Sequence, residues 1–225
     1  LLTAVSWLVI PAFAAAPFMV SQIALPPADA YFEAMSGLTT TGATVIVGLD
    51  TLPPGLLLWR SLLQWLGGIG IIAMGIAILP LLGVGGMQLF RSESSDRSDK
   101  VVPRASDLAI AVAWVYMTMT LACVAGLALS GMSLFDSVNH TMTALSTGGF
   151  STRDASIAGW GNPAVEWVLV VFMAAGGMPF VRFISLARGD AGPLWHDTQV
   201  RWYVGFLVAV STAMGLWLAQ TADLA

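Results

Sequence analysis

The chain has 225 residues, of which 57% are hydrophobic and only 10% are charged, and its formal net charge at pH 7 is −4. A soluble domain typically carries about 25% charged residues, so the composition excludes an ordinary water-soluble globule and predicts an integral membrane protein. The basic residues form no patch that would indicate nucleic-acid binding. The single cysteine, Cys123, allows neither an intramolecular disulfide nor a cysteine-based metal site.

Residues 1–20 form the first apolar stretch, which is long enough for a transmembrane span or for the end of one. The stretch lacks a basic leading segment and a small-residue cleavage site, so we do not interpret it as a signal peptide. Because the chain starts with Leu1 inside an apolar run, we expect it to be an internal piece of a longer protein.

Two apolar segments, 28–41 and 133–147, are too short to cross a bilayer. A helix rises about 1.5 Å per residue, so a dozen residues reach roughly 18 Å, whereas the hydrocarbon core is about 30 Å thick. We therefore expect a re-entrant half-helix or a surface helix at each place. Ser133 lies three residues before Asp136, which is typical of a helix N-cap.

Longer apolar stretches predict transmembrane helices at 55–82, 108–130, 163–187 and 200–219. Pro179 should kink the third of them, and the glycines at 67, 68, 70 and 75 favour close packing of the first against a neighbour. The polar loops 91–107 and 188–199 and their flanks carry most of the lysines and arginines. Because basic residues mark the cytoplasmic face, both short segments should enter the membrane from outside.

Each short segment leads into one of two related polar sequences, MSGLTTTGAT at 35–44 and MTALSTGGFS at 142–151. Gly42 corresponds to Gly149, and the other matching residues of the two copies are separated by the same offset along the chain. Thr-Thr-Gly alone is a weak signal that many turns contain. Two copies at one offset, each after a short apolar segment and before a glycine-bearing span, are far more specific.

The repeat predicts an all-α integral membrane fold that resembles a potassium channel. Each unit would consist of a span, a re-entrant pore helix, a filter loop and a second span, and the set is incomplete in this chain. We expect a first unit at 1–90, a cytoplasmic loop at 91–107, a second unit at 108–187, and a further loop with the first span of a third unit at 188–225.

The two polar loops have the chemistry of a cation site. Non-helical backbone at membrane depth is tolerated only where it is buried in protein or lines a wet path. Residues 39–44 and 146–151 contain no acidic side chain, so a cation would have to be held by carbonyl dipoles and hydroxyl oxygens. Gly42 and Gly149 permit a positive φ, and the C-terminus of each half-helix carries about half a negative charge.

Other polar residues within the apolar segments have plainer interpretations. Glu33 and His140 match at the same offset, and we favour structural hydrogen bonds over a role in transport. The matching Asp29 and Asp136 compensate the helix dipole or, alternatively, attract cations. The remaining candidates are Arg60, Gln64 and Arg182, which could pair across helices or snorkel, and Arg153 with Asp154, interpreted at most as an outer-surface ion pair.

Four motifs together resemble the Trk/Ktr/HKT superfamily of potassium transporters, closest to its bacterial uptake subunits: 35–44, QWLGGIG at 64–70, ALSTGGFS at 144–151 and GGMPFVR at 176–182. The resemblance covers nearly the whole chain and implies four linked units around one pore. It places the filter backbone, as the K⁺-binding residues, at Thr40, Thr41, Gly42, Thr147, Gly148 and Gly149, with Thr39 and Ser146 as secondary candidates. In this superfamily glycine at the position of Gly42 accompanies potassium permeation, and serine there accompanies sodium preference.

The resemblance further implies a multi-pass protein of the bacterial cytoplasmic (inner) membrane that moves K⁺ without a cofactor. Its implied partners are a second copy of the full-length protein and a cytosolic nucleotide-binding regulatory subunit. The third and fourth units fall outside this chain, so two of four filter parts are present and these residues alone should not close a pore.

Potassium transport is therefore the leading hypothesis. The alternative is a secondary transporter whose broken helices bind a small solute at the midplane, although the uncharged loops favour a filter. An enzyme is not expected, because the sequence has no paired catalytic aspartates, no zinc spacing and no notable Ser/His pair. A membrane scaffold without transport is the plainest remaining possibility.

Overall fold

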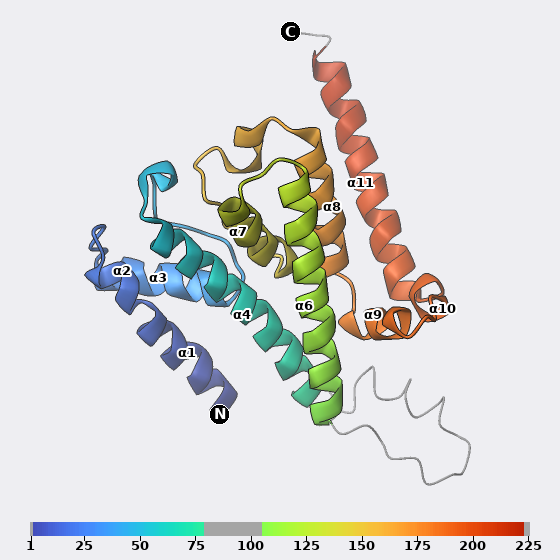
Figure 1. The fold of residues 1–225 in the computed structure, drawn as a ribbon, viewed down its shortest axis with the longest axis horizontal. Coiled ribbons are helices and arrows are strands. Elements are labelled where there is room, and N and C mark those ends of the chain that lie inside the picture. The colour runs from blue at the N-terminus through green and yellow to red at the C-terminus, as the bar shows by residue number, and fades with distance from the viewer. Residues whose placement is uncertain (1, 79–104, 223–225) are drawn as a thin grey trace. The chain divides into compact units, whose positions relative to one another are not determined.

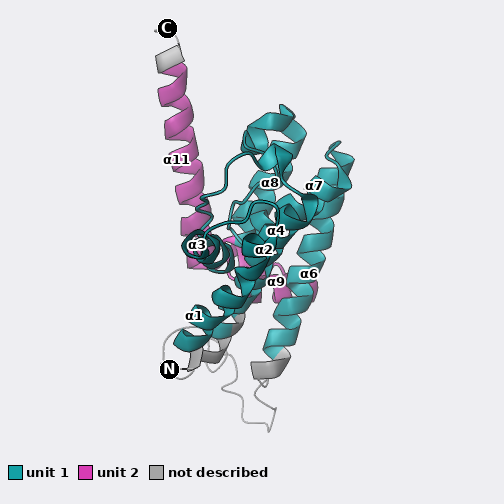
Figure 2. Cartoon of the chain, turned by 90° about the vertical axis from the view of Figure 1, so that its left-hand side faces the viewer, with its two compact units in different colours: residues 1–176 teal, residues 177–225 magenta. Residues whose placement is uncertain are grey.

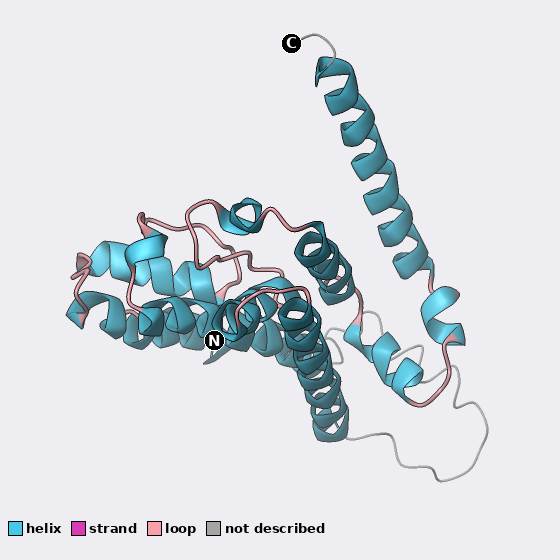
Figure 3. Cartoon of the chain, turned by 45° about the horizontal axis from the view of Figure 1, so that its top comes forward, coloured by secondary structure: helices cyan, strands magenta, loops and turns pink. Residues whose placement is uncertain are grey.

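The computed structural model describes residues 2–78 and 105–222, and it contains helices and loops but no strand within those ranges (Figures 1 and 3). The chain divides into two compact units, residues 1–176 and 177–225 (Figure 2). The predicted loop at 91–107 lies almost entirely outside the described residues.

The first apolar stretch forms two helices, α1 (Leu2–Ala14) and α2 (Ala16–Val20), rather than one continuous span. Pro17 lacks an N–H group, so it cannot continue the hydrogen-bond ladder across this point. The bonds change register there, since Ala15 N–H donates to Pro11 O while Phe18 N–H donates to Ala15 O.

The two short segments form twelve-residue helices, α3 (Pro27–Leu38) and α7 (Leu134–Leu145). This confirms the expected length, although each helix ends two or three residues before the end of the segment that the apolar pattern suggested. The Ser133 hydroxyl caps α7 by accepting from Asp136 N–H at 3.1 Å, as predicted. Helix α3 has Pro26 at its N-cap position and therefore no side-chain cap.

The longer elements follow in order as α4 (Pro54–Ile78), α6 (Ala105–Leu129), α8 (Pro163–Gly176), α9 (Phe180–Ala187), α10 (Gly192–Trp195) and α11 (Thr198–Ala222), with short 3-10 turns η1 (Leu49–Thr51) and η2 (Ser156–Trp160). Among the described residues, three helices are long and apolar enough to cross a membrane, in α4, α6 and α11. The pair α8 and α9 adds a fourth if it counts as one bent span. The predicted kink near Pro179 is thus a full break between Gly176 and Phe180.

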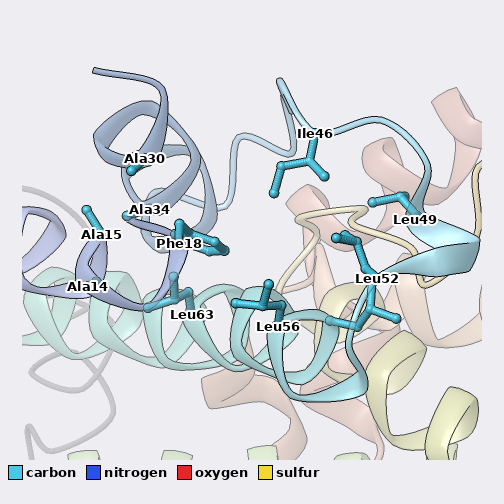
Figure 4. Packing of buried hydrophobic residues seen from close by; sticks show 11 residues of the cluster. Ala14, Ala15, Phe18, Ala30, Ala34, Ile46, Leu49, Leu52, Leu56 and Leu63 are labelled. Carbon is cyan, nitrogen blue, oxygen red and sulfur yellow. The ribbon is translucent and has the colours of Figure 1, made fainter. Parts of the chain in front are cut away.

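Within residues 1–176 each short helix has its own packing environment. Helix α3 contacts α1, α2 and α4, whereas α7 contacts α4, α6 and α8. Figure 4 shows the cluster around α3, in which Ala30 and Ala34 leave room for Phe18 and Leu63 lies on α4 below them. The cluster around α7 contains Cys123, Leu127, Ala144, Val165 and Leu169. Helix α4 contacts both short helices and so links the two halves of this unit.

Candidate ion-filter loops

The loops after α3 and α7 have the same backbone conformation at matching positions. We call residues 39–44 the first loop and residues 146–151 the second loop. Thr40 has φ 56° and Gly42 has φ 78°, while Thr147 has φ 57° and Gly149 has φ 79°. A β-branched residue at positive φ is a true outlier that costs of order 1–3 kcal/mol. Because the same strain recurs at the equivalent threonine of each copy, the surrounding structure must enforce this conformation.

The strain is held by a Schellman turn at the end of each short helix. In the first, Thr40 N–H donates to Gly37 O and Thr41 N–H donates to Ser36 O, both at 3.0 Å. In the second, the same two bonds run from Thr147 to Ala144 at 3.0 Å and from Gly148 to Thr143 at 2.9 Å. These turns satisfy carbonyls of the last helical turn and aim the C-terminus of each helix directly at its loop.

The carbonyl oxygens of both loops are available as ligands. Among the hydrogen bonds between described residues, none is accepted by the carbonyls of Thr40, Thr41, Gly42, Thr147, Gly148 or Gly149. Several hydroxyls of the loops are engaged in hydrogen bonds of their own. Thr39 Oγ1 donates to Met35 O at 2.8 Å, Ser146 Oγ donates to Thr143 O at 3.3 Å, and Thr147 Oγ1 donates to Ser146 O at 2.7 Å. The backbone therefore supplies the free acceptors, and the hydroxyls mainly stabilise the turns.

The structure brings the two loops into contact although they are far apart in sequence. A Cβ atom on Gly42 would overlap the carbonyl oxygen of Gly148. A Cβ atom on Gly148 would overlap the side chain of Gln64, while Gly149 has open space and needs glycine only for its positive φ. The predicted residues of the two copies thus lie together at one place.

A buried ion pair lies directly beside the first loop. Arg60 Nε donates to Glu33 Oε1 at 2.8 Å, and the two side chains are 1% and 0% exposed. Glu33 also accepts from the hydroxyl of Thr44 and from Val45 N–H at 3.1 Å. Pairing across helices is therefore the correct alternative for Arg60. The sequence signal was a basic residue in a span downstream of an acidic residue in a short helix, because ionisable groups at membrane depth pair with one another.

The second loop has a neutral counterpart of this contact. His140 Nδ1 donates to Asp136 O at 2.9 Å, so its Nε2 accepts from the Ser151 hydroxyl at 3.1 Å. His140 and Ser151 occupy the positions that match Glu33 and Thr44 in the first copy. A side chain on the short helix thus holds the far end of the loop in both cases. This supports the structural interpretation of Glu33 and His140.

Asp136 in the first turn of α7 and Asp154 in the segment after the second loop have specific partners. Asp136 accepts from the Thr152 hydroxyl at 2.7 Å and lies 4.0 Å from Arg153. Asp154 Oδ1 accepts from Gly48 N–H at 3.1 Å and Leu49 N–H at 3.0 Å. Interpreting Arg153 and Asp154 as a pair was therefore wrong. Each residue contacts a different element, and Asp154 connects the segment between α7 and α8 to the segment between α3 and α4.

The guanidinium of Arg153 also lies 4.1 Å from the centre of the Trp160 ring. In residues 177–225 a separate ion pair joins Arg182 Nε to Asp197 Oδ2 at 2.7 Å. Among the described residues no group of three or more histidine, cysteine or acidic side chains could hold a metal ion.

The fold and these loops define a class, namely an α-helical membrane protein in which short helices present strained, uncharged loops to one another. The chain belongs to the TrkH family of cation transport proteins, whose family model matches residues 1–221. It is 46% identical over 217 residues to the Trk system potassium uptake protein TrkI of Halomonas elongata, covering 96% of this chain and 44% of that relative. It is 40% identical to TrkH of Escherichia coli K12 over 223 residues, covering 96% and 46%.

The crystal structure of the potassium transporter TrkH from Vibrio parahaemolyticus has the same fold, with a TM-score of 0.85 and 35% sequence identity. That match covers 97% of this chain and 44% of the transporter. The chain therefore spans less than half the length of the relatives it matches.

Proposed function

We propose that this chain forms part of a potassium-uptake transporter and that the first and second loops supply two parts of its selectivity filter. The ion would be coordinated by the carbonyls of Thr40, Thr41 and Gly42 from the first loop and of Thr147, Gly148 and Gly149 from the second. The observation that carries the proposal is the shared left-handed turn and positive-φ glycine in two loops that touch one another.

The electrostatics of the loops suit a monovalent cation. Carbonyl dipoles can replace part of the hydration shell of K⁺, and the C-termini of α3 and α7 add negative potential. Glu33 is the only acidic side chain that contacts the first loop among the described residues, and Arg60 compensates its charge. A site with no net charge binds K⁺ weakly enough to release it, which conduction requires.

The wider architecture belongs to the same proposal. The segments 1–90 and 108–187 would be two span–pore helix–span units, and 188–225 would begin a third. The remaining filter parts would come from the rest of a full-length protein. A homodimer, a cytosolic nucleotide-binding regulatory subunit and a bacterial inner membrane complete it, because the resemblance to Trk-type transporters implies them.

The test is cation flux into liposomes that contain a protein of full family length carrying this sequence. We expect K⁺ flux to exceed Na⁺ flux, and the ratio to fall toward one in Gly42→Ser and Gly149→Ser. Both substitutions strain a positive-φ position, and the first also pushes into the Gly148 carbonyl. Gly131→Ser is the matched control, because Gly131 has φ 94° but lies outside both loops. Unchanged selectivity in both filter variants would contradict the proposal.

The secondary-transporter alternative predicts a different pattern. In a secondary transporter with broken helices we expect a charged or bulky side chain that recognises the solute. The side chains of both loops are uncharged, and all of them except Phe150 are small. Flux that ignores both glycines, combined with thermal stabilisation by a small solute but not by K⁺, would favour the alternative.

A further inference from the structure

Helix α4 carries two polar side chains, Arg60 and Gln64, that together contact both loops. They lie one helical turn apart and therefore on the same face of the helix. Arg60 is 1% exposed and Gln64 is 0% exposed. Burying a guanidinium and an amide at membrane depth is costly unless they are well bonded. The Gln64 Nε2 has no hydrogen-bond partner among the described residues, so the position of this side chain needs an explanation beyond packing.

The guanidinium of Arg60 binds in three directions at once. Its Nε donates to Glu33 on α3, and its Nη2 donates to the Thr44 hydroxyl at 3.1 Å, at the end of the first loop. Its Nη1 donates to the backbone carbonyl of Ser151 at 3.2 Å, at the end of the second loop. The same group lies 4.1 Å from the centre of the Phe150 ring. One rigid, planar group thus links both loop ends to one short helix.

Gln64 holds the middle of the second loop. Its Oε1 accepts from Phe150 N–H at 3.1 Å, and its side chain fills the space into which a Cβ atom of Gly148 would point. Gly148 in turn presents its carbonyl to Gly42 of the first loop. A shift of Gln64 would therefore move the surface on which the two loops meet.

The second half of the sequence has no such pair. When Gly67 is aligned with Gly176, the positions of Arg60 and Gln64 become Leu169 and Met173 on α8. Both replacements are apolar, and the matching pore-helix residue, His140, needs no compensating cation. Among the described residues, α4 is the spanning helix whose side chains form hydrogen bonds to both loops.

We infer that Arg60 and Gln64 are positioning residues that set the separation of the first and second loops and thereby the ion selectivity, without touching the ion themselves. The inference rests on the proposed filter function. It assigns selectivity to two side chains of a spanning helix, in addition to the loop backbone.

The experiment measures K⁺ and Na⁺ flux in liposomes for Gln64→Met and Arg60→Lys in the full-length protein. Methionine keeps the length of Gln64 but offers Phe150 N–H only a weak sulfur acceptor in place of the amide oxygen. Lysine keeps the charge of Arg60 but cannot bind three partners in a fixed fork. We expect both variants to transport K⁺, with the potassium-over-sodium flux ratio reduced by at least about threefold. Met173→Leu, at the corresponding position of α8, should leave the ratio unchanged.

A double variant separates selectivity from folding. Removing one partner of a buried ion pair leaves an uncompensated charge, whereas removing both is often tolerated, so Glu33→Gln with Arg60→Met should assemble even where a single change fails. Its flux ratio should also be reduced. A wild-type ratio in assembled Gln64→Met and in the assembled double variant would overturn the inference. So would failure of every variant to assemble beside a normal Met173→Leu protein, because the two residues would then serve folding alone.

Gly42→Ser, measured in parallel, distinguishes this inference from the proposal beneath it. If Gly42→Ser lowers the flux ratio and the Arg60 and Gln64 variants do not, only the positioning role fails. If Gly42→Ser has no effect either, the loops are not the filter and the function itself must be reconsidered.

Discussion

At the scale of single residues, glycines decide how closely the spans approach the short helices. A Cβ atom on Gly67 of α4 would overlap the carbonyl oxygen of Leu38, the last residue of α3. On α8, a Cβ atom on Gly176 would lie 2.6 Å from the carbonyl oxygen of Leu145, the last residue of α7. The sequence predicted that glycines in a span serve close packing. The structure adds the partner, which is the end of a short helix where its loop begins.

Gly67→Ala should therefore destabilise the protein, because the methyl group has no space beside Leu38. Overpacking of a tight site typically costs about 1–3 kcal/mol, and here backbone would have to move. Gly70→Ala is the matched control, since nothing lies within 4 Å of its added Cβ atom. Alanine is the better helix former by about 1 kcal/mol, so this variant should be neutral or more stable. The thermal unfolding midpoint in detergent compares them, and equal midpoints would contradict the packing argument.

Strained threonines are the residue-scale feature that sequence reasoning missed. Threonine disfavours positive φ, so nothing in its propensity predicts the left-handed turn at Thr40 and Thr147. Only the duplication hinted that these positions share a special conformation. Pairing of Arg60 across helices was one predicted alternative, but the sequence did not identify Glu33 as the partner. That choice depends on how α4 docks against α3, and a single sequence does not contain this orientation.

At the scale of elements, bilayer thickness predicted more than residue propensity did. A segment of a dozen residues cannot cross the membrane, and this argument alone identified α3 and α7 as separate elements of the correct length. The third predicted span, by contrast, is two helices. Pro179 and the neighbouring glycines interrupt the ladder, and Gly177 contacts the ring of Tyr203, where a Cβ atom would overlap. The elements α10, η1 and η2 were not predicted, because they are too short to show an apolar periodicity in the sequence.

The start of α11 is fixed by the charge of Asp197, which lies just before the apolar stretch Thr198–Gln220 of this helix. Asp197 Oδ1 accepts from Gln199 N–H at 2.7 Å and Val200 N–H at 3.2 Å, while Oδ2 accepts from Arg182. Partial burial alone would raise the pKa of Asp197, but the N–H groups of Val200 and Gln199 and the Arg182 guanidinium outweigh it and hold the pKa below its ordinary value.

A lowered pKa means that the ionised carboxylate of Asp197 stabilises the folded state. This contribution is present above the ordinary aspartate pKa of about 3.9 and is lost as the pH falls through the lower folded value. Asp197→Asn keeps a good N-cap but removes the charge, so the variant should be less stable at pH 7 and should approach the wild type below about pH 4. Thermal midpoints of both proteins across this range test the sign. A difference that grows on acidification would contradict it.

At the scale of the whole molecule, the two candidate filter loops depend on both halves of residues 1–176. Helix α4 contacts α3 and α7 together, and Asp154 reaches back to the loop before α4. Because the two loops contact each other at Gly42 and Gly148, we expect that neither half would keep its loop in this conformation alone. The sequence showed the duplication but not this contact, since equal spacing along a chain does not reveal which copies meet in space.

The proposed four-part filter makes a prediction about this chain in isolation. Two loops can surround a cation on only part of its circumference, so K⁺ would lose hydration water without gaining enough carbonyl ligands to replace it. Liposomes containing only this chain should therefore show no K⁺-selective flux, whereas a protein of full family length should show it. Circular dichroism would first establish that the isolated chain is helical, so that silence cannot be attributed to unfolding. Selective flux from the helical chain alone would instead mean that two copies assemble to present four loops, and cross-linking in the membrane would then reveal the dimer that closes the pore.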